Sequence, residues 1–286
     1  MDTSHFRVRP GDRKALTRIA PDETTRFDDK DAALAHVRKG IERLTSLQEL
    51  LYAQDRYSLL LVFQGMDGAG KDHVVKHVMS GVNPAGTEVH AFKQPSADDL
   101  DHDYLWRAAK VLPARGRIGI FNRSYYEEVL VVRVHPELLA AQKLPRERVG
   151  RHIWTHRFED INAFERHLWR NGTIIRKFYM HLSRSEQARR LRARLDDPAK
   201  NWKFSPSDLA ERAKWRAYRA AYADAIAATS HHHAPWFVVP ADHKWFAAVV
   251  VADVIVEALE DLDLSFPRLT PTQRQQLRAA RRRLGG

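Results

Sequence analysis

The chain contains 286 residues, of which 44% are hydrophobic and 29% are charged. This size and composition suit one globular α/β domain, or a core domain with a small insertion, and exclude a disordered chain. The absence of cysteine excludes disulfides, thiolate catalysis and cysteine-bound zinc. A net charge of +11, from 47 basic and 36 acidic residues, favours a polyanionic partner: nucleic acid, an acidic membrane surface or a phosphate-rich substrate.

The sequence predicts neither a signal peptide nor a membrane-spanning segment. The first nine residues lack the apolar core of a signal peptide. The most apolar late stretch, residues 245–259, is interrupted by Asp253 and Glu257. We therefore expect no membrane partner and a cytoplasmic location.

The predicted elements alternate along the chain. Residues 1–30 are polar and irregular and are expected to wrap the surface, whereas the spacing of apolar residues predicts a helix over 32–52. The run LLLVFQ, residues 59–64, is continuously apolar, as in a strand buried on both faces. Helical patterns, including residues 151–169 and 244–262, separate further candidate strands at residues 87–92, 118–121, 173–182 and 236–239. This alternation predicts a parallel sheet with helices on both faces.

A phosphate-binding motif follows the first predicted strand. It matches GxxxxGK, the main part of a Walker A loop, and a helical stretch follows it as that motif requires. Its residues are Gly65, Met66, Asp67, Gly68, Ala69, Gly70 and Lys71. Glycines let backbone N–H groups converge on phosphate oxygens, and the helix N-terminus adds positive potential. We therefore predict that this loop binds phosphates and that Lys71 stabilises a phosphoryl group during transfer.

Two carboxylates accompany the loop. Asp72 stands where a Walker A loop has Ser or Thr, and Asp67 lies inside the loop. Carboxylates beside bound phosphates require a cation, so Asp67 is predicted to hold Mg²⁺ directly or through water. Asp72 could do the same, cap the helix or pair with a basic neighbour.

A second polar cluster follows the strand predicted at residues 118–121. It comprises Asn122, Arg123, Ser124, Tyr125, Tyr126, Glu127 and Glu128. Because α/β folds bind ligands at the carboxyl ends of their strands, this cluster is expected to meet the phosphate-binding loop. Arg123 is suited to neutralising a transferring phosphoryl group, and Glu127 to nucleotide or metal binding. Asn122 replaces the usual Walker B acid, although a helix-capping role is the alternative.

Residues 184–222 differ from the rest of the chain. They are rich in basic side chains and contain the breakers Asp197-Pro198 and Ser205-Pro206. A charged helical hairpin inserted before the last strand is predicted, and in kinases with such a loop an insertion of this kind commonly acts as a lid. The alternative is a solvated helical face.

Four ordered segments together resemble the polyphosphate kinase 2 family, over about residues 6–267. They are GMDGAGKD at residues 65–72, FNRSYYEEVLVVRV at 121–134, SRSEQARRLRARLDDPAKNWKFSPSDL at 183–209 and APWFVVPADHKW at 234–245. The resemblance implies a single three-layer α/β/α P-loop kinase domain, similar to thymidylate kinases. An N-terminal helical extension over about residues 1–55 and a helical lid over about residues 184–222 are expected.

The resemblance also implies an activity. It implies reversible transfer of a phosphoryl group between inorganic polyphosphate and nucleotides, dependent on Mg²⁺, for which Mn²⁺ can substitute. Asn122 together with Glu127 looks like the class III pattern, which is associated with phosphorylation of both AMP and ADP, the latter giving ATP. A homo-oligomer is implied, and no nucleic acid partner is expected.

The family's functional residues map onto this sequence as follows. The expected catalytic residues are Asp67, Lys71, Asn122, Arg123 and Arg133. Nucleotide binding is expected of Asn122, Tyr126 and Glu127. Polyphosphate binding is expected of Lys71, Arg123, Arg190, Arg194, Lys200 and Lys203. Direct in-line transfer is the expected mechanism, since an acceptor phosphate oxygen is already anionic and needs no strong base.

Two alternatives remain open from the sequence. An ATP-dependent nucleotide kinase would share the fold and the phosphate-binding loop. A basic nucleic-acid-binding protein with a nucleotide switch is the second, although no RNA- or DNA-reading motif is present. The arginine-rich end, residues 273–286, could contact polyphosphate or nucleic acid, or be simply solvated.

Overall fold

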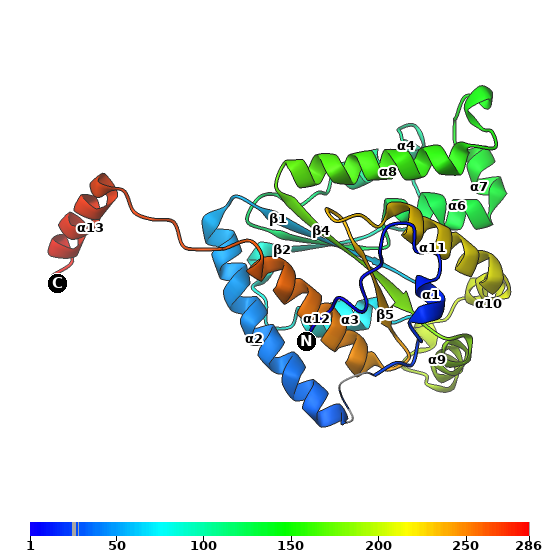
Figure 1. The fold of residues 1–286 in the computed structure, drawn as a ribbon, viewed down its shortest axis with the longest axis horizontal. Helices are drawn as coiled ribbons and strands as arrows, with labels where there is room; N and C mark the ends of the chain where they lie inside the picture. Colours follow the sequence, from blue (N-terminus) through cyan, green and yellow to red (C-terminus); the bar gives the residue numbers. More distant parts are fainter. Residues whose placement is uncertain (25–26, 28, 286) are drawn as a thin grey trace.

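A parallel five-stranded sheet forms the centre of the computed structural model, which describes residues 1–24, 27 and 29–285. Its order is β2-β3-β1-β4-β5, and every neighbouring pair is parallel (Figure 1). The strands are β1 (Ser58–Gln64), β2 (Thr87–Ala91), β3 (Ile118–Asn122), β4 (Thr173–His181) and β5 (Trp236–Pro240). The predicted α/β class and parallel sheet are confirmed.

Helices cover both faces of this sheet. On one face α12 (Lys244–Glu260) packs against α2 (Lys30–Gln54) and α3 (Lys71–Val78). On the other, α8 (Ile153–Arg170) packs on β4 beside α11 (Trp215–Thr229), as Figure 1 shows. The three layers expected of a P-loop kinase are therefore present.

Shorter helical segments connect these elements. The α-helical segments are α1 (Ala15–Arg18), α4 (Ala97–Leu100), α5 (Trp106–Ala109), α6 (Val131–Val134), α7 (Pro136–Ala141), α9 (Arg184–Asp196), α10 (Pro206–Ala213) and α13 (Pro271–Arg283). The 3₁₀ turns are η1 (Pro84–Gly86), η2 (Tyr125–Val129), η3 (Arg146–Arg148) and η4 (Asn201–Lys203).

The strands of the sheet centre are apolar because both of their faces are covered. Every residue of β1 is buried, and so is every residue of β5. The sequence Leu59–Val62 therefore shows no polar alternation, as expected for a parallel strand between two helical layers. In contrast, edge strand β2 has no buried residue.

The N-terminal segment lies along the edge of β5. The Val8 N–H donates to the Trp236 carbonyl at 2.9 Å, and the Val238 N–H donates to the Phe6 carbonyl at 2.9 Å. The side chains of Phe6 and Val8 are buried in the core. The start of the chain thus adds a short antiparallel cover to the sheet.

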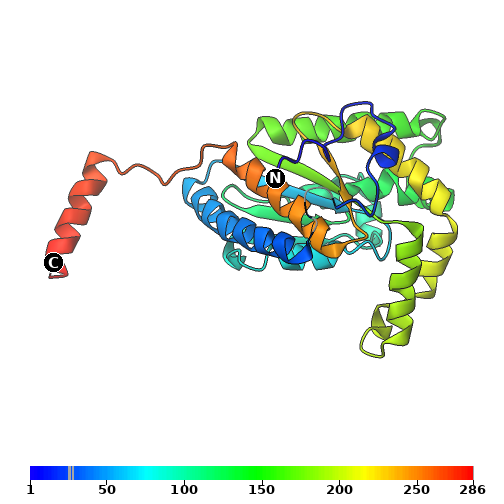
Figure 2. The same cartoon turned by 60° about the horizontal axis from the view of Figure 1, so that its bottom comes forward.

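Two helical parts project from this body. Helices α9 and α10 project as a pair, as Figure 2 shows. The segment 184–222, predicted as a helical hairpin, also includes the first half of α11, which packs on the body. The arginine-rich end forms α13, whose residues are all exposed and which points away from the body in both views. None of the helices in the described ranges combines the length and apolarity that a membrane crossing needs.

Candidate active site

The phosphate-binding loop turns directly from β1 into α3. Gly65 has a φ of 156°, and a Cβ at this position would lie 3.0 Å from the Met180 carbonyl oxygen. Gly68 and Gly70 have φ values of 82° and 92°, in the left-handed region that favours glycine. These glycines let the loop bring the N-terminus of α3 to the carboxyl edge of the sheet, where anions are stabilised.

Lys71 is the first residue of α3 and is 9% exposed. Its Nζ donates a 2.7 Å hydrogen bond to the Gly65 carbonyl oxygen, so the loop holds its own lysine. Burial, followed by the positive charge of Arg123, lowers the pKa of Lys71 to about 8. Phosphate oxygens entering the loop would restore a high pKa by supplying negative charge.

Arg123 follows β3 with an unusual backbone. Its φ of 61° is in the left-handed region, which costs a non-glycine residue about 1–2 kcal/mol. A 2.9 Å hydrogen bond from its N–H to the Phe63 carbonyl ties the turn to β1. Strain of this kind is retained where the surrounding structure fixes it, and functional sites are frequent examples.

The guanidinium of Arg123 bridges two carboxylates. It donates to Oδ1 of Asp67 at 2.7 Å and to Oε2 of Glu127 at 3.0 Å. The negative charge of Glu127, followed by that of Asp67, raises the pKa of Arg123 above its usual value. Arg123 therefore stays charged and connects the phosphate-binding loop to the polar cluster after β3.

Asn122 and Glu127 have partners of their own in the same cluster. The Asn122 amide donates to Oδ1 of Asp72, so this side chain faces α3 instead of capping a helix. The amide of Gln64 donates to Oε1 of Glu127 at 3.1 Å. The sequence prediction that the two clusters meet is therefore correct in its geometry.

A basic cleft of about 540 Å³ opens above the phosphate-binding loop. It unites the loop, the end of β3 and the projecting helices. Its positively charged lining residues are Lys71, Arg123, Arg189, Arg190, Arg194, Lys200, Lys203 and Lys244. Asp67 and Asp72 are the carboxylates in the same lining. Such a cleft suits a chain of phosphates with a cation at one end.

Lys244 was missed by the motif-based prediction. It begins α12 after a three-residue turn from the end of β5, at the same edge of the sheet as the phosphate-binding loop. Burial, followed by the charge of Arg190, lowers its pKa. The sequence did contain a signal for it, because a basic residue in the turn between a parallel strand and the next helix lies at the ligand-binding edge of the sheet.

Arg190 lines the cleft but is largely engaged within the protein. Its nitrogens donate to the Gly68 carbonyl at 2.9 Å, to the Ala241 carbonyl at 2.6 Å and to Oε1 of Glu186 at 2.7 Å. It thereby joins α9 to the phosphate-binding loop and to the turn after β5. Contact between Arg190 and polyphosphate stays a prediction, in addition to this structural role.

The other basic residues predicted in the lid have fewer contacts within the protein than Arg190. Arg194 on α9 pairs with Asp208 of α10 at 3.0 Å, which holds the two projecting helices together. Lys200 pairs with Asp197 at 2.5 Å, and Lys203 lies over the Trp202 ring. All three basic residues line the cleft, so the structure brings them to the same cavity as Lys71.

The side chain of Tyr126, which was predicted to bind nucleotide, does not line any of the cavities around Arg123. Its side chain is fully buried, and its hydroxyl donates to Oε1 of Glu165 at 2.8 Å while accepting from Lys177 at 2.9 Å. The η2 turn sends Tyr125 and Tyr126 into the core and leaves Glu127 facing the cavities. A linear motif cannot distinguish these directions.

Arg133 lies outside the cleft lining. On α6 it donates to Oδ2 of Asp224 at 2.7 Å, which links α6 to α11. It is absent from the linings of the cavities around Arg123. The structure therefore does not bring Arg133 together with the other predicted catalytic side chains.

A second cavity adjoins the basic cleft through Arg123. It measures about 540 Å³ and combines apolar walls with cationic groups. Its lining includes Phe92, Lys93, Leu100, Arg107, Arg123, Glu127, Val131, Val132, His135 and Leu138. A smaller cavity of about 240 Å³ shares lining residues with each of the two, and Arg123 lines all three. Apolar walls with a few charged groups are typical of nucleotide-sized ligand sites.

The carboxylates of the cleft fit a weakly held divalent cation. Among the described residues, no three His, Cys, Asp or Glu side chains form a ready-made metal cage. Mg²⁺ does not need one, since it usually keeps several waters and binds through one or two carboxylates plus substrate phosphates. Asp67 and Asp72, in one cleft with the phosphate-binding loop, are a donor set of that kind.

Comparison with known proteins finds relatives that all belong to one family. The family model described as polyphosphate kinase 2 (PPK2) matches residues 27–267. An ADP-polyphosphate phosphotransferase of Rhodopseudomonas palustris is 47% identical over 99% of this chain and 98% of its own length. An AMP/ADP-polyphosphate phosphotransferase of Meiothermus ruber is 43% identical over 92% of this chain and 95% of its own.

A solved structure has the same fold. The crystal structure of polyphosphate kinase 2 from Arthrobacter aurescens TC1 superposes with a TM-score of 0.86 and is 38% identical. The superposition covers 96% of this chain and 95% of that one. The likeness in fold therefore extends over nearly the whole of both chains.

Proposed function

Because this chain belongs to the polyphosphate kinase 2 family, we propose that it transfers the terminal phosphoryl group of inorganic polyphosphate to both AMP and ADP, reversibly. The observation that carries this proposal is the position of Arg123, which lines the basic cleft and both adjoining cavities. A donor in the cleft and an acceptor in the apolar cavity would meet at this guanidinium.

The donor side follows from charge. Eight cations line the cleft, against two carboxylates, so a chain of phosphates can exchange its counterions for fixed ammonium and guanidinium groups. The terminal phosphoryl group would lie at the phosphate-binding loop, against Lys71. Lys200 and Lys203, which line the same cleft, would hold the following phosphates.

The acceptor side follows from shape and polarity. The second cavity has apolar walls for a nucleoside, including Phe92 and Val131, and cationic groups, Lys93 and Arg107, for its phosphates. Glu127 lines this cavity and accepts a hydrogen bond from Arg123. With Asn122, Glu127 supports acceptance of both AMP and ADP, because the pair matches the class III pattern.

The transfer step is direct. An acceptor phosphate oxygen attacks the terminal phosphorus in line, the bond to the bridging oxygen breaks, and the shortened polyphosphate leaves with that oxygen's electron pair. Lys71 and Arg123 stabilise the equatorial oxygens as charge builds on them. Mg²⁺, held by Asp67 and Asp72 when bound, would neutralise further charge on the phosphates. Closure of α9 and α10 over the cleft would exclude water and limit hydrolysis.

One experiment tests the acceptor range. The protein is incubated with long-chain polyphosphate and Mg²⁺, with AMP or ADP in separate tubes, and all nucleotides are separated by chromatography. ADP and then ATP are expected from AMP, and ATP from ADP. A tube with ADP but no polyphosphate controls for disproportionation.

The outcomes separate the candidate activities. If polyphosphate gives ATP from ADP but no product from AMP, the protein is still a polyphosphate kinase and the class III assignment is overturned. No product in either tube, with activity when ATP is the donor, would favour the ATP-dependent nucleotide kinase. The homo-oligomer implied by the family resemblance is a separate proposal, which light scattering of the purified protein would test.

A further inference from the structure

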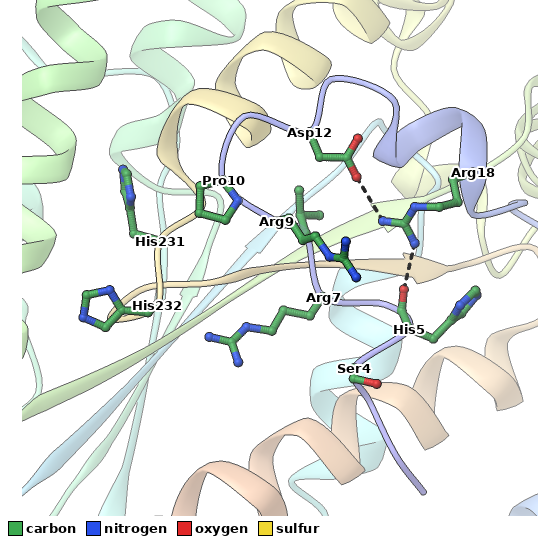
Figure 3. A pocket seen from close by; sticks show the side chains of 10 residues that line it. Ser4, His5, Arg7, Arg9, Pro10, Asp12, Arg18, His231 and His232 are labelled. Carbon is green, nitrogen blue, oxygen red and sulfur yellow. Dashed lines mark hydrogen bonds and ion pairs between the residues drawn. The ribbon is translucent and has the colours of Figure 1, made fainter.

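A large basic cavity lies at the edge of β5, formed mainly by the first residues of the chain (Figure 3). Its volume is about 790 Å³. Its lining residues are Ser4, His5, Arg7, Val8, Arg9, Pro10, Asp12, Arg18, His231 and His232. None of them lines the cavities around Arg123, which lie at the carboxyl end of the sheet.

The backbone holds Arg7 and Arg9 side by side. Phe6 and Val8 point into the core, so the residues that alternate with them point outward, as in any extended segment. The Ser230 hydroxyl donates to the Val8 carbonyl at 2.7 Å, and the Gly11 N–H donates to the Ala227 carbonyl at 2.9 Å. The two arginines therefore project from a fixed backbone, which lowers the entropy lost on binding.

The charge of this cavity is largely uncompensated. Asp12 is the only carboxylate of its lining, and Arg18 already pairs with it at 3.1 Å. Within the described ranges, Arg7 and Arg9 form no ion pair. Figure 3 shows both guanidinium groups in the cavity, with His231 and His232 on another side of it. An anion with several charges would satisfy these donors together.

The lining favours a phosphate chain over a nucleotide. Val8 and Pro10 are its only apolar residues, which is too little wall for a nucleoside base. Guanidinium groups, in contrast, match phosphate oxygens in geometry and charge. The volume of about 790 Å³ is also sufficient for several phosphate units.

We propose that this cavity is a second oligophosphate site, separate from the phosphate-binding loop. The choice of ligand rests on the proposed function, because polyphosphate is then the polyanion that this protein meets. The binding itself does not depend on turnover. Residues 4–18 precede the part of the chain matched by the family model, residues 27–267.

Direct titration with tripolyphosphate tests the proposal. Calorimetry at low ionic strength is carried out on the Lys71→Ala protein, in which binding at the loop is weakened. A binding event is expected there, and adding Arg7→Gln and Arg9→Gln should weaken it by about tenfold or more, the equivalent of one good charged hydrogen bond. Arg7→Lys with Arg9→Lys should retain most of the affinity.

A matched control removes the same net charge elsewhere. Arg38 and Arg146 are exposed and form no ion pair within the described ranges, so Arg38→Gln with Arg146→Gln should change the affinity by less than about twofold. Equal weakening in both double variants, or no binding event in the Lys71→Ala protein, would overturn the proposal. Thermal unfolding verifies that each variant is folded.

Chain-length kinetics identify the source of the bound phosphates. The kinetic test uses Arg7→Gln with Arg9→Gln in the otherwise unchanged protein. If this variant has a higher KM for long polyphosphate and an unchanged KM for tripolyphosphate, the cavity holds the distal part of the substrate chain. If both KM values are unchanged while direct binding is lost, it holds a separate chain. Because the titration needs no turnover, failure of the proposed activity would be recognised independently.

Discussion

Arg123 donates a 2.7 Å hydrogen bond to Oδ1 of Asp67, and this bond joins the turn after β3 to the phosphate-binding loop after β1. The two strands are neighbours in the sheet, so residues far apart in the sequence meet at one edge. A phosphate that binds Arg123 competes with this carboxylate. Donor binding would therefore release Asp67 toward a divalent cation, and the two events should reinforce each other.

Asp67→Asn tests that coupling. Removing the charge should raise the Mg²⁺ concentration for half-maximal activity by about tenfold or more, since Mg²⁺ prefers carboxylate oxygens. The measurement is activity against Mg²⁺ at saturating polyphosphate. Asp98→Asn, an exposed carboxylate on α4, is the control. An unchanged Mg²⁺ requirement in Asp67→Asn would refute the metal assignment.

Lys71→Ala should lower kcat by about 10²–10³, the range typical for removal of one group that stabilises transition-state charge. Lys76→Ala, on the same helix but outside the cleft lining, should retain nearly full activity. Initial rates of ATP formation from polyphosphate and ADP measure both. Similar losses in the two variants would indicate damage to α3 instead of a role at the reacting phosphate.

The lowered pKa of Lys71 predicts a pH dependence. With a pKa of about 8, the ammonium is charged below this pH and neutral above it. An uncharged amine cannot attract polyphosphate, so kcat/KM for polyphosphate should fall above pH 8. Lys71→Arg should remove the falling limb, because a guanidinium stays charged. The profile is measured as kcat/KM for polyphosphate between about pH 6.5 and about pH 9.5. If Lys71→Arg shows the same fall above pH 8, the fall belongs to another titrating group.

The projecting helices should contribute to affinity more than to rate. Lys200→Gln with Lys203→Gln should raise KM for long polyphosphate by several-fold, with a smaller effect on kcat and a weaker effect at high salt. Arg281→Gln with Arg283→Gln removes the same charge from exposed α13 and serves as the control. A salt-independent KM would contradict electrostatic capture of the donor.

The buried pair Lys177–Glu165 should be important for stability. Both side chains are fully buried, and Nζ donates to Oε2 at 2.5 Å and to the Thr229 carbonyl at 2.7 Å. Lys177→Met should cost about 3–5 kcal/mol, because Glu165 loses its partner in the core. Lys177→Met with Glu165→Leu should cost less than the single change. Urea unfolding at pH 7 measures both, and equal costs would argue against an unpaired carboxylate as the cause.

The sequence predicted the fold well because its apolar patterns are strong. The run that forms β1 is fully buried, and the strand before a GxxxxGK loop can occupy few places in an α/β sheet. The meeting of Lys71 with Arg123 followed from the rule that parallel strands end at one edge. These predictions depended on periodicity and topology, which a single sequence contains.

Side-chain direction and long-range partners could not be predicted from the sequence. Tyr126 and Glu127 are adjacent in the motif, but the 3₁₀ turn directs one into the core and the other toward the cavities. The pairing of Arg133 with Asp224 on α11 depends on how two helices pack, which the spacing of residues does not contain. Lys244 was missed because it lies in a different segment from the loop that it faces.

The cover of β5 has a practical consequence for handling the protein. An uncovered strand offers free N–H and C=O groups to other chains and promotes aggregation. The Phe6 and Val8 backbone occupies those groups on β5, whereas β2, at the opposite edge, has Glu88 and His90 among its residues. Deleting the first ten residues should therefore give a preparation that precipitates on storage, and purification tags belong beyond α13.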